Sequence, residues 1–215
     1  MLYNNRQDAA EKLIPLLKEY IDSESVVLAV PRGGVPIGYA IARHYKLPLD
    51  LLLIKKIGHP SNPELAIGAV SLEDEILDDY FSISNDYTNK KIKEIRENLK
   101  LRFKKFMGNR SSVDLKNKTV LIVDDGIATG NTLLSAIQLV RRKSPKKIIV
   151  AVPVAPYDTA VKIRSKVEAF ICPNIPVNFR GVGEFYYDFA QVSDEEVIHL
   201  MEEMRRTPTK TIKTS

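Results

Sequence analysis

The sequence contains a single cysteine and no apolar run long enough to cross a membrane. Cys172 has no second cysteine to pair with, which excludes an intrachain disulfide. A membrane-spanning helix needs about 18 or more consecutive apolar residues, and no segment comes near this length. Charged residues interrupt the first 20 positions, which predicts an amphipathic helix rather than a signal peptide. We therefore expect a cytoplasmic protein with no membrane partner.

Signatures of nucleic-acid binding are also lacking, although the chain is basic. It has 32 Lys and Arg residues against 27 Asp and Glu residues, a net charge of +5. The basic residues of segment 90–110 alternate with apolar residues at helical spacing, so they indicate the solvated face of a helix. No RRM, KH, zinc-finger or helix-turn-helix pattern occurs. The charge fits an anionic small molecule better than a nucleic acid.

What the sequence does contain is an alternation of apolar runs with helical patterns. Strands that alternate with helices indicate βαβ units and a mainly parallel, twisted sheet with helices on both faces. We therefore predict an α/β fold of one domain over residues 1–204. The expected strands are 26–30, 49–54, 120–123, 148–152 and 167–171, and the expected helices are 35–45, 83–107, 133–142 and 158–166.

Three segments lie outside this alternation. Segment 58–80 combines prolines and glycines with short apolar pieces, which indicates a loop followed by a hairpin. Segment 173–192 is irregular and aromatic, and we expect it to form a small cap. Ser193 then suits the N-cap of a final helix, with Glu196 completing a capping box. The polar residues 205–215 predict a disordered tail.

The most informative stretch is Val120–Thr132, an apolar run that ends in Asp124 and Asp125 and continues into Ala128-Thr-Gly-Asn-Thr132. Open α/β sheets bind ligands at the carboxyl ends of their strands. Backbone N–H groups, hydroxyls and the start of a helix favour a phosphate at Thr129–Thr132. The two carboxylates would repel that phosphate, but they suit the hydroxyl groups of a vicinal diol. A phosphorylated ribose satisfies both requirements.

Other interpretations of this stretch fit less well. A Walker A loop needs four residues between its glycines, followed by Lys and Ser or Thr. Here only three residues separate Gly126 from Gly130, and Asn131 stands in place of the lysine. An acidic pocket of the response-regulator type does not need the Thr129–Thr132 loop, and a phosphatase or nucleotide hydrolase lacks a nucleophile motif. A plain turn after a core strand remains the structural alternative.

A second strand-to-helix turn carries Arg32, Gly33 and Gly34. The glycines permit a close approach of a ligand to the backbone, and the guanidinium group matches phosphate oxygens. The alternative is a tight connection with a solvated arginine. Read together, the two loops suit a ligand with a phosphate at one end, a ribose in the middle and a pyrophosphate at the other.

These two loops together resemble the type I phosphoribosyltransferases, which bind 5-phosphoribosyl-1-pyrophosphate (PRPP). The likeness covers about 6–204, and the segments 55–70 and 185–196 are similar to a bacterial and archaeal subgroup of predicted phosphoribosyltransferases. The resemblance implies the type I fold, Mg²⁺ as cofactor, and a pyrophosphate loop that often contains a non-proline cis peptide. It implies catalytic roles for Arg32, Asp124 and Asp125. The implied PRPP-binding residues are Arg32, Gly33, Gly34, Asp124, Asp125, Ala128, Thr129, Gly130, Asn131 and Thr132.

Several further residues are candidates for the same site. Lys55 or Lys56 could add charge at the pyrophosphate, and His59 lies in a loop that could close over PRPP; solvated side chains are the alternative for all three. Arg180 and Phe185 could contact the acceptor from the cap, or the cap aromatics could simply anchor the last helix. Ala128 stands where the 6-oxopurine enzymes of the family carry an aspartate. This disfavours hypoxanthine and guanine as acceptors.

The resulting hypothesis is an Mg²⁺-dependent phosphoribosyltransferase that releases pyrophosphate and acts on an unidentified nitrogenous acceptor. Magnesium uses few protein ligands, so we expect no direct protein ligand for the metal. The alternative is a PRPP-sensing regulatory protein that keeps both loops and performs no transfer. PRPP and pyrophosphate are the expected small-molecule partners, and a homodimer is compatible with this interpretation.

Overall fold

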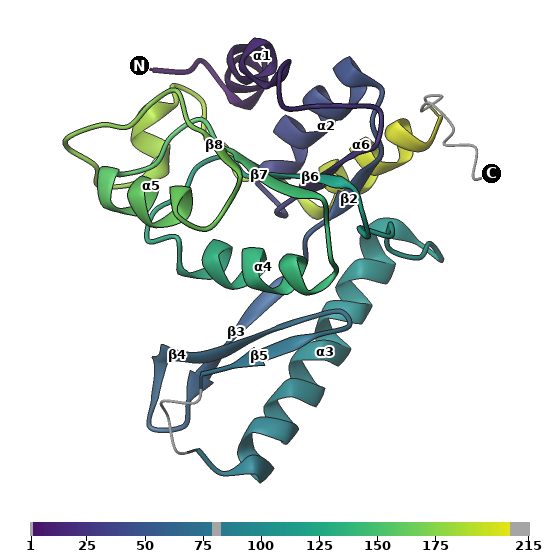
Figure 1. Cartoon of the computed structure of the whole chain (residues 1–215), viewed down its shortest axis with the longest axis vertical. Coiled ribbons are helices and arrows are strands. Elements are labelled where there is room, and N and C mark those ends of the chain that lie inside the picture. The colour runs from purple at the N-terminus through teal and green to yellow at the C-terminus, as the bar shows by residue number, and fades with distance from the viewer. Residues whose placement is uncertain (1, 79–82, 207–215) are drawn as a thin grey trace.

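The computed structural model describes residues 2–78 and 83–206, and its centre is a sheet of five parallel strands (Figure 1). The strand order is β2-β1-β6-β7-β8, so the chain visits one edge of the sheet before it crosses to the other. This confirms the predicted α/β fold. The strands are β1 (Ser25–Ala29), β2 (Leu49–Leu51), β6 (Thr119–Val123), β7 (Lys147–Ala151) and β8 (Ala169–Ile171).

Helices cover both faces of this sheet (Figure 1). One face packs against α1 (Arg6–Leu17), α2 (Gly34–Tyr45) and α6 (Asp194–Arg206), and the other against α4 (Asn131–Arg142) and α5 (Tyr157–Arg164). Side chains of β1 and β6 alternate between two apolar clusters, one on each face, which is why both strands are continuous apolar runs. No helix within the described residues is long and apolar enough to cross a membrane.

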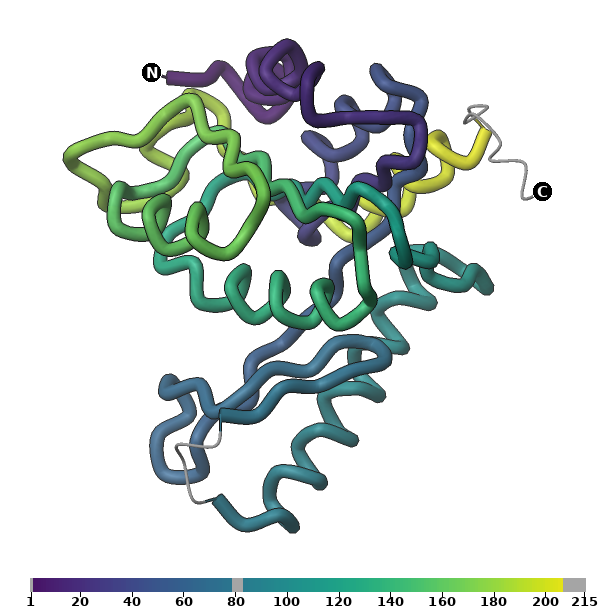
Figure 2. Tube along the Cα trace, viewed as in Figure 1, coloured from purple at the N-terminus to yellow at the C-terminus, as the bar shows by residue number. Residues whose placement is uncertain are grey.

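A second sheet of three antiparallel strands lies beside the central one. It consists of β3 (Ile54–His59), β4 (Asn62–Ser71) and β5 (Glu75–Leu77), in the order β3-β4-β5. The long helix α3 (Asn85–Met107) packs against it, and α4 contacts all three of its strands. Figures 1 and 2 show this unit as a projection on the α4 side of the central sheet.

Two sequence-based boundaries near this sheet are wrong. The run 49–54 is not one strand, because β2 ends at Leu51 and β3 begins at Ile54 in the other sheet. The residues between them, Leu52 and Leu53, are buried, so their apolar character reflects burial between the two sheets. The predicted loop at the start of 58–80 is instead a tight hairpin. Its strand β4 begins with five exposed residues, which hide the alternation that marks a strand.

Residues 173–206 include the segment predicted as a cap and the final helix. The cap 173–192 is irregular and contains one 3₁₀ turn, η1 (Val182–Phe185). The backbone N–H of Glu196 donates to the Ser193 hydroxyl oxygen at 3.1 Å, which confirms Ser193 as the N-cap of α6. The helix runs to Arg206, two residues into the segment predicted as a tail. The rest of that predicted tail, 207–215, lies outside the described residues.

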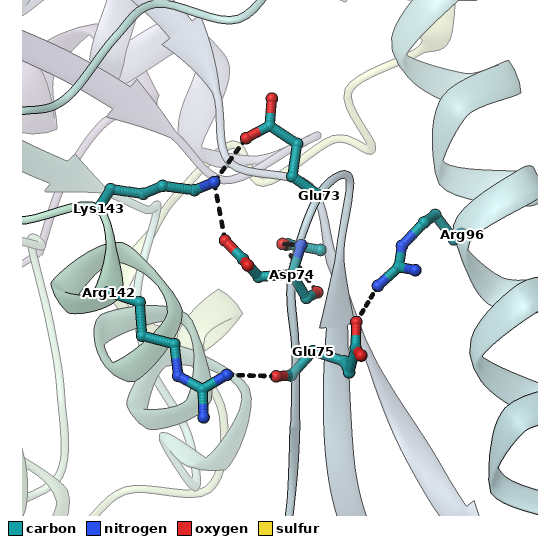
Figure 3. Close-up of polar contacts among 7 residues, drawn as sticks. Glu73, Asp74, Glu75, Arg96, Arg142 and Lys143 are labelled. Carbon is teal, nitrogen blue, oxygen red and sulfur yellow. Dashed lines mark hydrogen bonds and ion pairs between the residues drawn. The ribbon is translucent and has the colours of Figure 1, made fainter.

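Ion pairs and hydrogen bonds connect the turn between β4 and β5 to the end of α4 and to α3 (Figure 3). The Lys143 amine contacts the carboxylates of Glu73 and Asp74 at 2.6 and 2.8 Å. The Arg142 guanidinium donates to the Glu75 carbonyl oxygen at 2.6 Å, and Arg96 from α3 pairs with the Glu75 carboxylate. These contacts fix the second sheet to the same helix whose first turn carries the Thr129–Thr132 loop.

A buried carboxyl group anchors the connection that leads into β6. Asp50 lies on β2 with 2% of its surface exposed. Its two oxygens accept hydrogen bonds from the backbone N–H groups of Leu51 and Val113, both at 2.7 Å. Burial raises the pKa of Asp50, and these two bonds and Arg110 oppose the rise. The group therefore ties an irregular segment to the edge of the central sheet.

We expect Asp50→Asn to change how stability depends on pH. Because the folded-state pKa of Asp50 lies above 3.8, its contribution to folding is fully present below that pH and is lost as the pH rises through the folded pKa. Asparagine does not titrate, so wild type should lose stability relative to the variant as the pH rises above about 4. Urea unfolding at a series of pH values measures this. A difference that stays constant across the range would contradict the prediction.

Candidate active site

The parallel pairing of β1 with β6 brings the two predicted loops into contact. The register places Ala29 opposite Val123, and the Val30 N–H donates to the Val123 carbonyl at 2.9 Å just beyond the strands. A Cβ atom on Gly33 would lie 2.0 Å from Oδ2 of Asp125. The Arg32–Gly34 loop therefore rests directly on the acid pair, and a side chain at Gly33 would displace it.

The arginine of this first loop is held by a carboxylate from the last helix. The peptide bond between Pro31 and Arg32 is cis, as the family resemblance implies for this loop. Nη1 of Arg32 lies 3.3 Å from Oδ1 of Asp194, and the Lys105 amine contacts Oδ2 of Asp194 at 2.6 Å. Asp194 is the first residue of α6, so α3 and α6 together orient the guanidinium group.

The second loop forms the beginning of α4. Gly130 has a φ of 74° and is the N-cap residue, and the helix starts at Asn131. The Thr159 hydroxyl donates to the Ala128 carbonyl at 2.8 Å, which holds the loop against α5. Thr129, Asn131 and Thr132 are exposed. The first N–H groups of a helix have no intrahelical acceptor, so this loop has the chemistry of a phosphate site.

The acid pair between the loops is paired with an arginine of α1. Nε and Nη2 of Arg6 donate to Oδ2 of Asp125 at 2.9 and 2.7 Å, and the two side chains are 12% and 14% exposed. Oδ1 of Asp124 accepts the backbone N–H of Asp125 at 2.9 Å. Burial, and then the charge of Asp125, raises the pKa of Asp124 well above its usual range, while Arg6 opposes the rise. This environment favours one negative charge over two.

A cavity of about 440 Å³ opens beside these groups. It is bounded by the first loop, Asp125 and the cap, and its charged lining residues are two arginines and one aspartate; Gly34, Asp124 and residues 128–132 are not among its lining residues. Such a charge balance suits an anionic ligand with hydroxyl groups. The residues that line it are Arg6, Arg32, Gly33, Asp125, Val182, Phe189, Gln191 and Val192.

The aromatic side chains of the cap pack mainly on one another. Tyr186 lies between Tyr3 and Phe189, with ring centroids 5.4 and 4.8 Å away, and the Arg6 guanidinium carbon lies 4.1 Å from the centre of the Phe189 ring. Phe185, a predicted acceptor contact, stacks on Phe179. The rings therefore anchor the cap on Tyr3 and on Arg6 of α1, and the apolar residues that line the cavity are Val182, Val192 and Phe189.

Other predicted site residues lie away from this cavity. Lys55, Lys56 and His59 belong to β3 in the second sheet, and the Lys56 amine contacts the Glu64 carboxylate at 3.0 Å. Nδ1 of His59 accepts the backbone N–H of Ser61 at 3.2 Å. Arg180 is exposed, and its backbone N–H donates to Glu184. None of the four lines the cavity beside Asp125, and their suggested roles stay predictions.

Sequence reasoning missed Arg6, Asp194 and Tyr186, whose hydroxyl donates to the Asp125 carbonyl at 2.7 Å. In the sequence, Arg6 is one of several charged residues on a predicted amphipathic helix. Asp194 is an acidic residue directly after a predicted N-cap, which is common in helices. Their positions depend on contacts between segments more than 100 residues apart. No motif or spacing in the sequence marks such contacts.

The residues also allow a test of whether the site suits a metal ion. Within 2–78 and 83–206 no group of three His, Cys, Asp or Glu side chains is placed to hold a metal. Asp124 and Asp125 are adjacent carboxyls beside the cavity, and Oδ2 of Asp125 already accepts from Arg6. Magnesium commonly keeps several waters and uses one or two carboxylates with substrate phosphates. The acid pair fits an ion brought in by a phosphorylated ligand.

Comparisons with known proteins agree on one family. The family model of the phosphoribosyl transferase domain matches residues 2–190. A protein of Mycobacterium tuberculosis (strain CDC 1551 / Oshkosh), provisionally named a phosphoribosyl transferase, is 33% identical over 211 residues, which are 95% of this chain and 47% of that protein. The chain thus spans about half the length of the curated relatives it matches.

Solved structures give the same picture of the fold. A crystal structure of a protein from Thermus thermophilus superposes with a TM-score of 0.87 at 32% identity, and the match covers 95% of this chain and 99% of that one. A Neisseria gonorrhoeae protein solved with bound ppGpp has a TM-score of 0.53 at 13% identity, covering 94% of each chain, which shows the fold alone. The family match covers both loops, the acid pair and most of the cap. The chain belongs to the phosphoribosyl transferase family.

Proposed function

We propose that the chain binds PRPP with Mg²⁺ and transfers its 5-phosphoribosyl group to a nitrogenous acceptor, with release of pyrophosphate. The observation that carries this proposal is the contact between the Arg32–Gly34 loop and the Asp124–Asp125 pair, beside a cavity lined by Arg32, Gly33 and Asp125. Membership of the family supports a transferase role for this arrangement.

Each part of PRPP has a chemical counterpart in the site. The 5-phosphate would bind at Thr129–Thr132, where helix N–H groups and hydroxyls converge. The ribose hydroxyls would hydrogen-bond to Asp124 and Asp125, which together carry one negative charge, and a hydrogen bond to a charged carboxylate is strong. The pyrophosphate would lie over Gly33 and Gly34 with Arg32 as its cation.

In this reaction the bond between ribose C1 and the pyrophosphate oxygen breaks, and its electron pair leaves with the pyrophosphate. The acceptor nitrogen forms the new bond to C1 from its lone pair and then loses a proton to solvent. Arg32 would neutralise the leaving group, and the acid pair would hold the sugar in place. Bound Mg²⁺ would supply additional charge neutralisation at the pyrophosphate.

The residues that line the cavity, together with Ala128, limit which acceptor the site could bind. Ala128 supplies no carboxylate that could exchange a proton with a base, which disfavours a 6-oxopurine. Val182 and Val192 offer an apolar surface, and the Gln191 side chain can both donate and accept a hydrogen bond. An acceptor with a flat apolar face and a polar edge fits this combination.

Binding of PRPP should raise thermal stability. A ligand at about 100 times its Kd stabilises the folded state by about 2.7 kcal/mol, and the shift should be larger with Mg²⁺ than without. Asp125→Asn should weaken the shift, whereas Asp114→Asn, an exposed carboxylate outside the cavity, should keep it. Thermal unfolding at millimolar PRPP measures all three proteins. No shift for wild type would refute the proposal, and pyrophosphate release across a panel of bases separates an enzyme from a PRPP sensor.

Gly33→Ala should abolish this PRPP-dependent shift. The added methyl group would lie 2.0 Å from Oδ2 of Asp125, so the acid pair or the loop must move, at a cost of about 1–3 kcal/mol in the free energy of unfolding. Gly181→Ala is the matched control, because nothing lies within 4 Å of its added methyl group and its backbone is extended. Urea unfolding and calorimetric titration with PRPP give the two quantities. Equal PRPP affinity in both variants would contradict the assignment of this loop.

A further inference from the structure

Arg6 makes more contacts with the site than a helix residue needs for its own stability. It is the first residue of α1, after the N-cap Asn5. Besides its two hydrogen bonds to Oδ2 of Asp125, it donates through Nη1 to the Ala190 carbonyl at 2.7 Å. All three bonds thus reach either the acid pair or the cap, and both bonds to Asp125 end on the same oxygen.

The Arg6 guanidinium group is also the end member of a stack with the Phe189 and Tyr186 rings, and Tyr186 of this stack binds the backbone of Asp125. It covers one face of Phe189, and Tyr186 stacks on that ring at 4.8 Å. The Tyr186 hydroxyl donates to the Asp125 carbonyl at 2.7 Å. The carboxylate of Asp125 is therefore bound by Arg6 of α1, and its main-chain carbonyl is bound by Tyr186 of the cap. Arg6 contacts both the carboxylate and the ring stack that contains Tyr186.

The docking of α1 does not depend on this arginine. The helix buries Ala9, Ala10, Leu13 and Leu17 completely against the central sheet and α2. Burial of four apolar side chains is the main source of helix docking. A purely structural ion pair at Arg6 would add little to the stability that this burial already provides. The contact of Arg6 with the acid pair therefore indicates a role in the site.

We propose that Arg6 is a positioning residue for phosphoribosyl transfer: it fixes the Asp125 carboxylate that accepts a ribose hydroxyl, and it joins that carboxylate to the cap beside the acceptor. This inference rests on the proposed function. Arg6 acts through Asp125 and is distinct from Arg32, which lies on the pyrophosphate loop and pairs with Asp194.

The test is PRPP affinity by calorimetry with Mg²⁺ for wild type, Arg6→Gln and Arg6→Lys. The glutamine variant removes both hydrogen bonds that Arg6 donates to Oδ2 of Asp125. Arg6→Gln should therefore bind PRPP about tenfold more weakly than wild type, and Arg6→Lys, which keeps the positive charge, should restore part of the affinity.

Arg43→Gln is the matched control, because Arg43 is an exposed arginine that also lies over an aromatic ring, that of Tyr39. It should bind like wild type. Affinity equal to wild type in Arg6→Gln would overturn the inference while the proposed function stands. Failure of wild type to bind PRPP would overturn both.

A second measurement needs no ligand and covers the case of a weakened fold. A double-mutant cycle of Arg6→Gln with Asp125→Asn in urea unfolding gives the coupling between the two side chains. The pair should be coupled, so that the double variant is more stable than the sum of the single effects predicts. Additive effects would show that Arg6 does not act through Asp125 and would overturn the inference.

Discussion

The parallel pairing of β1 with β6 is the constraint on which the site depends. Because Ala29 lies opposite Val123, the loops that follow the two strands leave the sheet together. Both strands are buried on both faces, so their register cannot shift without breaking the packing of two apolar clusters. Gly33 then allows a contact so close that a single methyl group would separate the loops. An anion-binding turn and a pair of carboxyl groups can lie in direct contact only under these conditions.

The charges of the site are balanced by residues from distant parts of the chain. Arg6 of α1 pairs with Asp125, and Asp194 of α6 pairs with Arg32 and Lys105. The Arg6–Asp125 pair is 12% and 14% exposed, and a buried ion pair of this kind adds little net stability, because removing two charges from water costs about as much as their attraction returns. The first and last helices thus set the orientation of the two central side chains of the site. Each of these helices also packs its own apolar face on the same side of the sheet.

Most of the fold could be predicted because the apolar pattern reports burial directly. Continuous runs marked β1, β6 and β7, and the Ser193 N-cap marked the start of α6. The same pattern misled at 49–54, where burial between two sheets resembles a strand, and in β4, whose exposed half has no alternation. The first error arises where the chain passes from one sheet to the other, and the second where a strand extends into solvent. Periodicity describes one element in one environment, so it does not mark a change of sheet or a strand that is exposed on both faces.

The sequence by itself determined the chemistry of the two loops, since glycines, hydroxyls, an arginine and adjacent carboxylates suit only a few kinds of ligand. It also determined the parallel sheet that brings strand ends to one edge. Only the tertiary structure decided that Arg6 holds Asp125, that the cap rings stack on one another, and that β3 carries Lys55, Lys56 and His59 away from the cavity. The physical reason is that local sequence sets backbone conformation and burial, whereas a side-chain pair across more than 100 residues exists only once the elements have packed.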